Sequence, residues 1–343
     1  MPHINRRSFL GSSLGGFAAA LTFGPSLLAQ DASRLAESAK IAEPSLAPDT
    51  LFLSWQGDPT TTMTVQWLGP DSASDQSVRY AAVNAKLQKP APQAGPHETA
   101  AGVPPAEGKA TGEVTALDSP AWRIVKTLTK AYPNTNLKVH RCELTGLTAA
   151  TEYQFRIGTN SRAYHFRTLP AKATDTFQFV SGGDCGIGDH AIRTNMLAAR
   201  QEPYFVLIAG DLAYDDGRSP ETFTKFLQNY HAHMIDSAGR LIPMLTCIGN
   251  HEVNGGYKTR RADSPQYLSL FDGLYAEKTY GVVDIGDYLS LVLLDTGHIE
   301  PIGGEQTEWL AATLAARQER PHLIVANHVP AYPSYRPPQG ENG

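Results

Sequence analysis

The chain has 343 residues, of which 41% are hydrophobic and 18% are charged, and its formal net charge is -5 at pH 7. These values are typical of a globular protein, and no cluster of Lys and Arg is long enough to follow a phosphate backbone, which argues against nucleic acid as a structural partner. Beyond the N-terminal segment no apolar run reaches about 18 residues, so we expect no membrane span in the mature protein.

Residues 1–29 have the features of an export signal. Arg6 and Arg7 stand before a mildly apolar stretch rich in Gly, Ala and Leu, and Ala29 is suited to cleavage. This pattern resembles a twin-arginine signal, and its glycines argue against the alternative of a short amphipathic helix. We therefore expect the twin-arginine export machinery as a partner and a periplasmic or secreted protein, in which residues 30–43 form a linker.

Residues 44–170 are predicted to form an all-β sandwich domain. Met63, Val65 and Trp67 alternate with polar residues, which indicates a half-buried strand. Tyr153 follows a Leu-x-x-Leu turn, and this resembles the tyrosine corner of fibronectin type III and related sandwiches. Further strands are predicted at 78–80, 121–125, 138–140 and 152–157, and a long surface loop at 89–120, where Ala, Pro and Gly are abundant.

From residue 175 to residue 343 the sequence changes to buried apolar strands that alternate with amphipathic helices. This order predicts a layered α/β domain, in which ligands bind at the carboxyl ends of the strands. The predicted strands cover 177–180, 204–209, 241–248, 288–294 and 323–326, and the predicted helices cover 192–200, 221–235 and 305–317.

The chain has only three cysteines, Cys142, Cys185 and Cys247. This small and odd number does not make a disulfide scaffold, even in an exported protein. We predict that all three are small buried hydrophobic residues, although a pairing of Cys185 with Cys247 stays open.

Four of the predicted α/β strands end in polar residues that are suited to metal binding. A single Asp after a strand is more simply a helix cap or a turn residue, but four such ends in one domain indicate a common site. Carboxylate, phenol, amide and imidazole groups suit hard or borderline cations. The motifs are, in chain order, Gly183-Asp184-Cys185-Gly186, Gly210-Asp211-Leu212-Ala213-Tyr214, Gly249-Asn250-His251-Glu252 and Val325-Ala326-Asn327-His328.

These motifs resemble those of the purple acid phosphatases, a family of the calcineurin-like metallophosphoesterase superfamily. Most members of the superfamily have Asp-x-His in the first motif, whereas this chain has Gly186 in place of that histidine and supplies Tyr214 three residues after Asp211. Residues 303–310, which follow a strand end at Asp295, also resemble the family. The resemblance implies a fibronectin type III-like domain followed by a layered α/β metallophosphoesterase domain, a β-sandwich flanked by helices.

The resemblance also implies a dinuclear metal centre of Fe(III) and a divalent ion of iron, zinc or manganese. Asp184, Asp211 and Tyr214 would bind the ferric ion, and Asp211 would bridge to the divalent ion, which Asn250 and His328 also bind. The implied activity is that of an exported acid phosphatase, in which metal-bound hydroxide attacks a small-molecule phosphate monoester. A phosphodiesterase or nucleotide hydrolase on the same metals is one alternative, and a non-catalytic binding module is another.

His251 is predicted to be the catalytic residue that hydrogen-bonds a phosphate oxygen or protonates the leaving alkoxide, with a turn-stabilising role as the alternative. Other histidines carry less weight. His231 and His233 lie on a predicted helix, where side chains two positions apart diverge. His298 comes before His328, in the wrong order for a family motif, and is interpreted as a loop residue.

The final Gly-His-x-His motif of the family, which supplies one histidine to each metal, has no counterpart after His328. We therefore expect a C-terminally incomplete metallophosphoesterase domain, with natural loss of a metal site as the alternative. Residues 30–343 expressed alone are expected to be inactive, colourless and poorly soluble.

Overall fold

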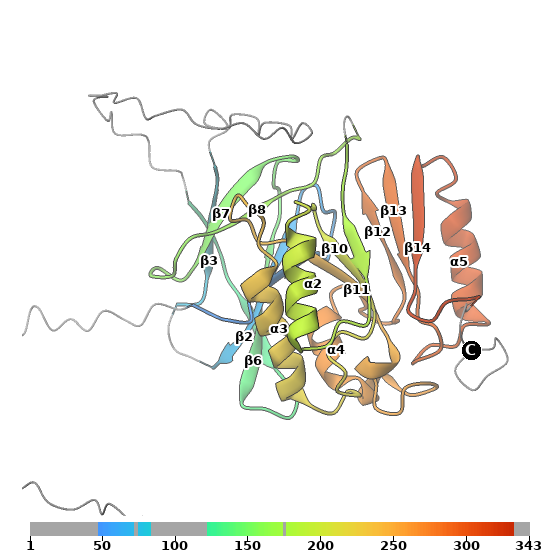
Figure 1. The fold of residues 1–343 in the computed structure, drawn as a ribbon. Helices are drawn as coiled ribbons and strands as arrows, with labels where there is room; N and C mark the ends of the chain where they lie inside the picture. Colours follow the sequence, from blue (N-terminus) through green and yellow to red (C-terminus); the bar gives the residue numbers. More distant parts are fainter. Residues whose placement is uncertain (1–46, 72–74, 84–121, 174–175, 333–343) are drawn as a thin grey trace, which may run out of the picture. The chain divides into compact units, whose positions relative to one another are not determined.

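The structure is a computed structural model that describes residues 47–71, 75–83, 122–173 and 176–332 (Figure 1). All of these residues belong to one compact unit, which spans residues 45–343. The predicted export signal at 1–29, the linker at 30–43 and the surface loop at 89–120 lie outside the described residues.

The N-terminal half consists of two four-stranded antiparallel sheets, which confirms its predicted all-β class. One sheet has the order β1-β2-β6-β5 and the other the order β4-β3-β7-β8. The strands are β1 (Phe52–Ser54), β2 (Met63–Pro70), β3 (Val78–Ala82), β4 (Arg123–Val125), β5 (Leu128–Ala131), β6 (Leu137–Leu144), β7 (Glu152–Ile157) and β8 (Tyr164–Arg167).

Strand β2 differs from the predicted half-buried strand. Its apolar residues are buried as expected, but Thr64 and Gln66 on the other face are buried as well. The polar groups of this face have partners. The hydroxyl of Thr64 donates to the Glu143 carboxylate, and the guanidinium of Arg141 donates to the Gln66 side chain at 2.6 Å and to the carbonyl oxygen of Leu270 at 2.9 Å. The polar face of β2 is therefore covered by a later part of the chain.

The predicted tyrosine corner is present in the turn before β7. The hydroxyl oxygen of Tyr153 accepts a hydrogen bond of 2.8 Å from the backbone N–H of Thr148. The ring of Tyr153 also stacks on Phe166 of β8, with 5.4 Å between ring centroids. The corner thus fixes the turn against the sheet that follows it.

The second half is a layered α/β arrangement of two three-stranded sheets, as predicted. One sheet is parallel and has the order β11-β10-β9, whereas the other has the order β12-β13-β14, in which β12 runs antiparallel to β13. The strands are β9 (Val180–Gly182), β10 (Val206–Ala209), β11 (Met244–Cys247), β12 (Gly281–Ile285), β13 (Leu289–Leu293) and β14 (His322–Ala326).

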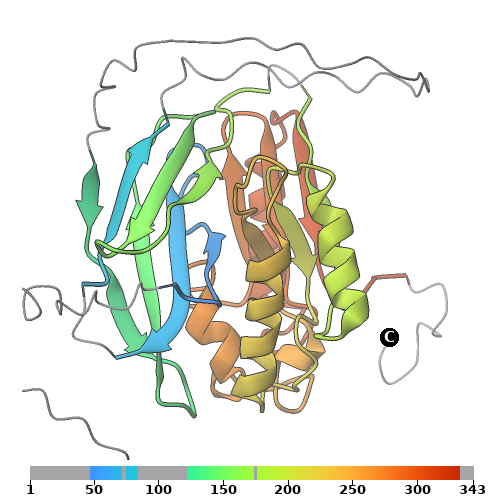
Figure 2. The same cartoon turned by 60° about the vertical axis from the view of Figure 1, so that its left-hand side comes forward.

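Two helices, α2 and α3, lie side by side on one face of the parallel sheet (Figures 1 and 2). Helix α3 starts after Ser219, whose hydroxyl oxygen accepts from the backbone N–H of Thr222, and Pro220 occupies the first turn. No described helix is long and apolar enough to span a membrane. The helices are α2 (Asp189–Ala199), α3 (Pro220–His233), α4 (Pro265–Phe271) and α5 (Glu305–Ala315), with short 3₁₀ turns η2 (Asn250–Glu252) and η3 (Arg261–Asp263).

One apolar core runs through both halves. Phe52 of β1 contacts Phe271 of α4 with 5.8 Å between ring centroids, and Trp55 meets Phe205 edge to face at 6.0 Å. The cysteines are all free thiols, so the open Cys185–Cys247 pairing is not formed. Cys142 and Cys247 are buried as predicted, whereas Cys185 is half-buried.

Candidate active site

The strand ends of the second half place the predicted polar residues on loops that are joined through the main chain. After β9 and β10 the parallel pairing continues into the loops, with hydrogen bonds from Asp184 N–H to the Gly210 carbonyl at 3.2 Å and from Cys185 N–H to the Asp211 carbonyl at 2.8 Å. Asp184 and Asp211 both have a positive φ, of 52° and 54°. This rare backbone conformation for residues other than glycine is often found at functional sites.

Asp184 and Tyr214 form the first pair of the site. The hydroxyl of Tyr214 donates a hydrogen bond of 2.8 Å to Asp184 Oδ1. Desolvation and this bond to a carboxylate raise the pKa of Tyr214 well above its ordinary value, so the phenol is protonated here. The ring of Tyr214 also lies over Gly186, where a Cβ atom would come within 3.7 Å of Tyr214 Cδ2. The tyrosine ring thus lies next to the Gly186 position of the first motif.

Asp211, Asn250 and His328 form the second group. The Nε2 atom of His328 lies 3.0 Å from Asn250 Oδ1 and 3.3 Å from Asp211 Oδ2, and its Nδ1 lies 2.9 Å from the Ala209 carbonyl. Burial lowers the pKa of His328, but the buried Asp211 carboxylate reverses this, and the pKa is raised overall. Two oxygens, one from Asn250 and one from Asp211, therefore converge on one ring nitrogen of His328.

These two groups fit hard or borderline cations by their donor chemistry. Each group contains one carboxylate, Asp184 in the first and Asp211 in the second, whose negative charge a cation would balance. Among the described residues, no metal-binding group consists of three or more His, Cys, Asp or Glu side chains. The number of donors needed for a metal site is reached here when the Tyr214 phenol and the Asn250 amide are counted as well.

His251 connects the two groups. Its backbone N–H donates to Asp211 Oδ1 at 2.9 Å, and its ring packs on Tyr214 with 4.3 Å between centroids. Its Nδ1 pairs with the carboxylate of Asp216, which leaves Nε2, 3.8 Å from Asp211 Oδ2, as the unclaimed ring atom. The backbone does stabilise a turn, as in the alternative reading, but the side chain is 30% exposed beside the site. Sequence reasoning missed Asp216, although its place two residues after Tyr214 is a usable signal.

Glu252 is a second residue that the sequence did not reveal. Its carboxylate is 1% exposed and accepts from the backbone N–H groups of Asp211, Leu212 and Gly249 at 2.8, 2.7 and 2.7 Å. Burial raises the pKa of Glu252 to about 7. A single buried side chain thus links the loop after β10 to the loop after β11.

Gly249 is required by the close approach of these two loops. A Cβ atom at this position would lie 2.4 Å from Asp211 Oδ1 and 2.5 Å from the Asp211 backbone nitrogen. Such distances are far inside van der Waals contact, so no larger residue fits without movement of the backbone.

Two of the histidines given less weight in the sequence have structural contacts. His231 lies apart from the two groups, whereas His298 lies close to His328. His231 bonds through Nδ1 to the Leu51 carbonyl at 2.9 Å and thereby joins α3 to β1. His298 does lie in a loop, but it is fully buried and its ring centroid is 5.7 Å from that of His328. The interpretation of His298 as a mere loop residue was therefore incomplete.

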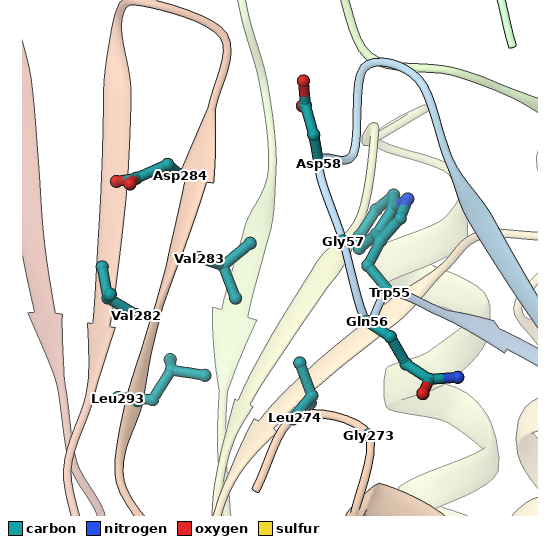
Figure 3. A pocket seen from close by; sticks show the side chains of 11 residues that line it. Trp55, Gln56, Gly57, Asp58, Gly273, Leu274, Val282, Val283, Asp284 and Leu293 are labelled. Carbon is teal, nitrogen blue, oxygen red and sulfur yellow. The ribbon is translucent and has the colours of Figure 1, made fainter. Parts of the chain in front are cut away.

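A cavity of about 230 Å³ lies away from the site, between the segment after β1 and strands β12 and β13 (Figure 3). Trp55, Leu274 and Val283 are among its apolar lining residues. The acidic residues of the lining are already engaged, because Asp58 accepts from Thr60 and Asp284 accepts from Arg317. The chemistry of the strand-end motifs is therefore not located in this cavity.

The chain matches two family models in succession. Residues 48–179 match the model described as "Purple acid Phosphatase, N-terminal domain", and residues 178–342 match "Calcineurin-like phosphoesterase".

Curated relatives carry related names. The chain is 25% identical over 225 residues to purple acid phosphatase 15 of Arabidopsis thaliana, a match that covers 57% of this chain and 42% of that protein. Purple acid phosphatase 22 of the same plant is 26% identical over 249 residues, with coverages of 68% and 51%. Acid phosphatase type 7 of Homo sapiens is 23% identical over 308 residues, with coverages of 85% and 61%. The chain thus spans about half the length of the curated relatives it matches.

Proposed function

Because the chain belongs to the purple acid phosphatases of the calcineurin-like phosphoesterases, we propose that its protein is a metal-dependent acid phosphatase that hydrolyses phosphate monoesters. The observation that carries this proposal is the meeting of Asp211, Asn250 and His328, which come from three separate strand ends. Oxygen and nitrogen donors that converge in this way on a buried carboxylate suit a cation and a phosphate ester better than an apolar ligand.

Each metal has a set of side chains that would hold it. Asp184, Asp211 and Tyr214 would bind Fe(III), and Asp211, Asn250 and His328 would bind a divalent ion of iron, zinc or manganese. Asp211 suits the shared position because its two carboxylate oxygens can serve two cations. When bound, the metal pair supplies positive charge that makes water more acidic and neutralises phosphoryl oxygens.

His251 is the residue that we assign to the substrate. Asp216 holds Nδ1, so Nε2 is the atom that can donate a hydrogen bond to a phosphate oxygen or a proton to the leaving alkoxide. The ring is fixed on its other side by the contact with Tyr214 and by its own backbone bond to Asp211. A fixed donor of this kind needs little reorientation as the ester bond breaks.

Export through the twin-arginine machinery to the periplasm or beyond is part of the proposal. A protein that folds before export can acquire its metals in the cytoplasm, where it avoids competition from other metals outside. Replacement of both Arg6 and Arg7 by Lys is expected to leave the precursor in the cytoplasm. Normal export of this variant would count against the proposed route.

The test of the activity is metal analysis of the full-length protein combined with assays on chromogenic mono- and diesters. We expect two metals per chain, a visible absorption band and faster turnover of the monoester. Tyr214→Phe should remove the band and retain part of the iron, whereas Tyr332→Phe, at an exposed tyrosine, should change neither. Preference for the diester would indicate a phosphodiesterase, and bound metal without any turnover would indicate a binding module.

A further inference from the structure

His298 is buried between two loops that bear site residues. Its side chain is completely inaccessible, and its ring packs on Tyr257 with 4.9 Å between centroids. On another side its ring centroid lies 5.7 Å from that of His328. The proposed chemistry assigns no role to His298, although both of its ring nitrogens have polar partners.

The partners of His298 determine which nitrogen carries its proton. Nδ1 lies 2.9 Å from the carbonyl oxygen of Gly256, which can only accept, so Nδ1 must donate. In the neutral ring with this proton on Nδ1, Nε2 has a lone pair, and the hydroxyl of Thr296, at 3.0 Å, is its donor.

The hydroxyl of Thr296 extends this connection to the loop after β14. Because the hydroxyl proton points to His298, the oxygen can accept, and it receives the backbone N–H of Val329 at 3.2 Å. Val329 directly follows His328. A directed series of hydrogen bonds therefore runs from Val329 through Thr296 and His298 to Gly256, in the loop that follows Asn250.

The loop that carries Thr296 and His298 is itself firmly held. The carboxylate of Asp295, which is 1% exposed, accepts from the backbone N–H groups of His298, Ile299 and Glu300 at 2.7, 3.0 and 2.8 Å. The hydroxyl of Thr279 donates to the same carboxylate. The two middle members of the series, Thr296 and His298, thus lie on a loop that four hydrogen bonds to Asp295 hold together.

We propose that His298 is a positioning residue, which acts through Thr296 to hold the His328 loop in place against the Asn250 loop. The bond of 3.0 Å between His328 Nε2 and Asn250 Oδ1 depends on the relative placement of these two loops. The inference rests on the proposed function, in which both side chains bind the divalent ion.

The central experiment compares Thr296→Val with Thr296→Ser in the full-length protein. Valine keeps the shape of threonine but can neither donate to His298 nor accept from Val329, whereas serine keeps the hydroxyl. We expect Thr296→Val to weaken Mn²⁺ binding, measured by titration calorimetry, by roughly 10- to 100-fold, as is usual for groups that orient a metal ligand. Thr296→Ser should bind nearly as well as the wild type, and so should Thr194→Val on the exposed side of α2.

A second variant tests whether the two residues act as one unit. His298→Phe keeps the ring and its contact with Tyr257 but loses both hydrogen bonds. Its effect on Mn²⁺ affinity should overlap with that of Thr296→Val, so that the double variant is little worse than either single one. Independent, additive effects would contradict the series of hydrogen bonds.

Nitrogen-15 NMR of the histidine rings gives a readout that does not require activity. We expect His298 to be the neutral form protonated on Nδ1, and Thr296→Val to shift the ring resonances of His298 and His328. A proton on Nε2 of His298, or unchanged Mn²⁺ affinity and His328 resonances in Thr296→Val, would overturn the inference. Wild-type protein that binds Mn²⁺ without turnover would instead overturn the proposed activity. If the wild type binds no Mn²⁺, the inference is tested by whether Thr296→Val shifts the ring resonances of His298 and His328.

Discussion

The buried carboxylate of Glu252 accepts a hydrogen bond of 2.8 Å from the backbone N–H of Asp211. Asp211 is the residue proposed to bind both metals, and its backbone has a positive φ of 54°, which is uncommon for residues other than glycine. Glu252, which has no proposed role in metal binding, therefore holds the backbone of the proposed metal ligand Asp211 in place.

Glu252→Gln should destabilise the protein and reduce turnover. The amide NH₂ of glutamine would face a backbone N–H that now donates to the carboxylate, and a buried donor left without an acceptor costs about 1–3 kcal/mol in the free energy of unfolding. Urea denaturation measures this cost. Glu308→Gln, the same change at an exposed position of α5, is the control and should be nearly neutral. Equal stability of the two variants would contradict the role given to Glu252.

Gly249→Ala should disturb the site more than its small size suggests. The new methyl group would overlap the backbone and carboxylate of Asp211, and overpacking of this kind costs typically 1–3 kcal/mol. Gly303→Ala is the matched control, because a Cβ atom there meets no described atom within 4 Å. Thermal unfolding should show a lower midpoint only for Gly249→Ala, and an unchanged midpoint would mean that the loops can separate freely.

Asp284 on β12 should make stability depend on pH below about pH 5. The side chain of Arg317, after α5, donates two hydrogen bonds to it at 2.9 and 2.8 Å, and this holds the pKa of Asp284 below its ordinary value of 3.8. Because the folded pKa is the lower one, the stabilisation is complete above about pH 5, well above the ordinary pKa, and is lost as pH falls through the folded pKa.

The comparison of wild type with Asp284→Asn tests this pH dependence. Their difference in unfolding free energy should be constant above about pH 5 and should shrink toward pH 3. Arg317→Gln removes the same ion pair from the other side and should show the same profile. A difference that stays constant down to pH 3 would contradict the assignment.

Asp211→Asn and Asn250→Ala should have distinguishable effects on metal content in the full-length protein. A neutral amide bridges two cations poorly, so Asp211→Asn should reduce the content of both metals. It should lower turnover by more than roughly 100-fold, which is the upper end of the usual effect of residues that hydrogen-bond to a metal ligand. Asn250→Ala should chiefly deplete the divalent ion. Full metal content and full rate in Asp211→Asn would show that the ligand assignment is wrong.

The elements that sequence patterns predicted are those with one clear apolar face or a long apolar run. Helix α3 was predicted because its apolar residues recur at helical spacing, and they are buried. Helix α4 was missed because five of its seven residues are buried, including Gln266, so it shows no polar face. Strand β5 was missed for the opposite reason, since Leu128 within it is 76% exposed. Burial that depends on distant segments leaves no local pattern.

The candidate site followed from strand-end motifs because parallel strands bring their carboxyl ends to one edge of a sheet. The structure brings together Asp211, Asn250 and His328, and pairs Asp184 with Tyr214. The supporting residues could not be found in this way. Glu252, Asp216 and His298 act through backbone groups or through a second side chain, and such contacts depend on how loops fold against each other rather than on spacing in the chain.

The continued pairing of the loops after β9 and β10 also has a consequence for motion. Asp184 and Asp211 sit on segments tied by main-chain hydrogen bonds, including one of 3.0 Å from Gly186 N–H to the Leu212 carbonyl, so thermal displacement of one segment carries the other with it. The backbones of Asp184 and Asp211 should therefore move together. The distances that we expect to vary most are those from these two residues to Asn250, after β11, and to His328, after β14.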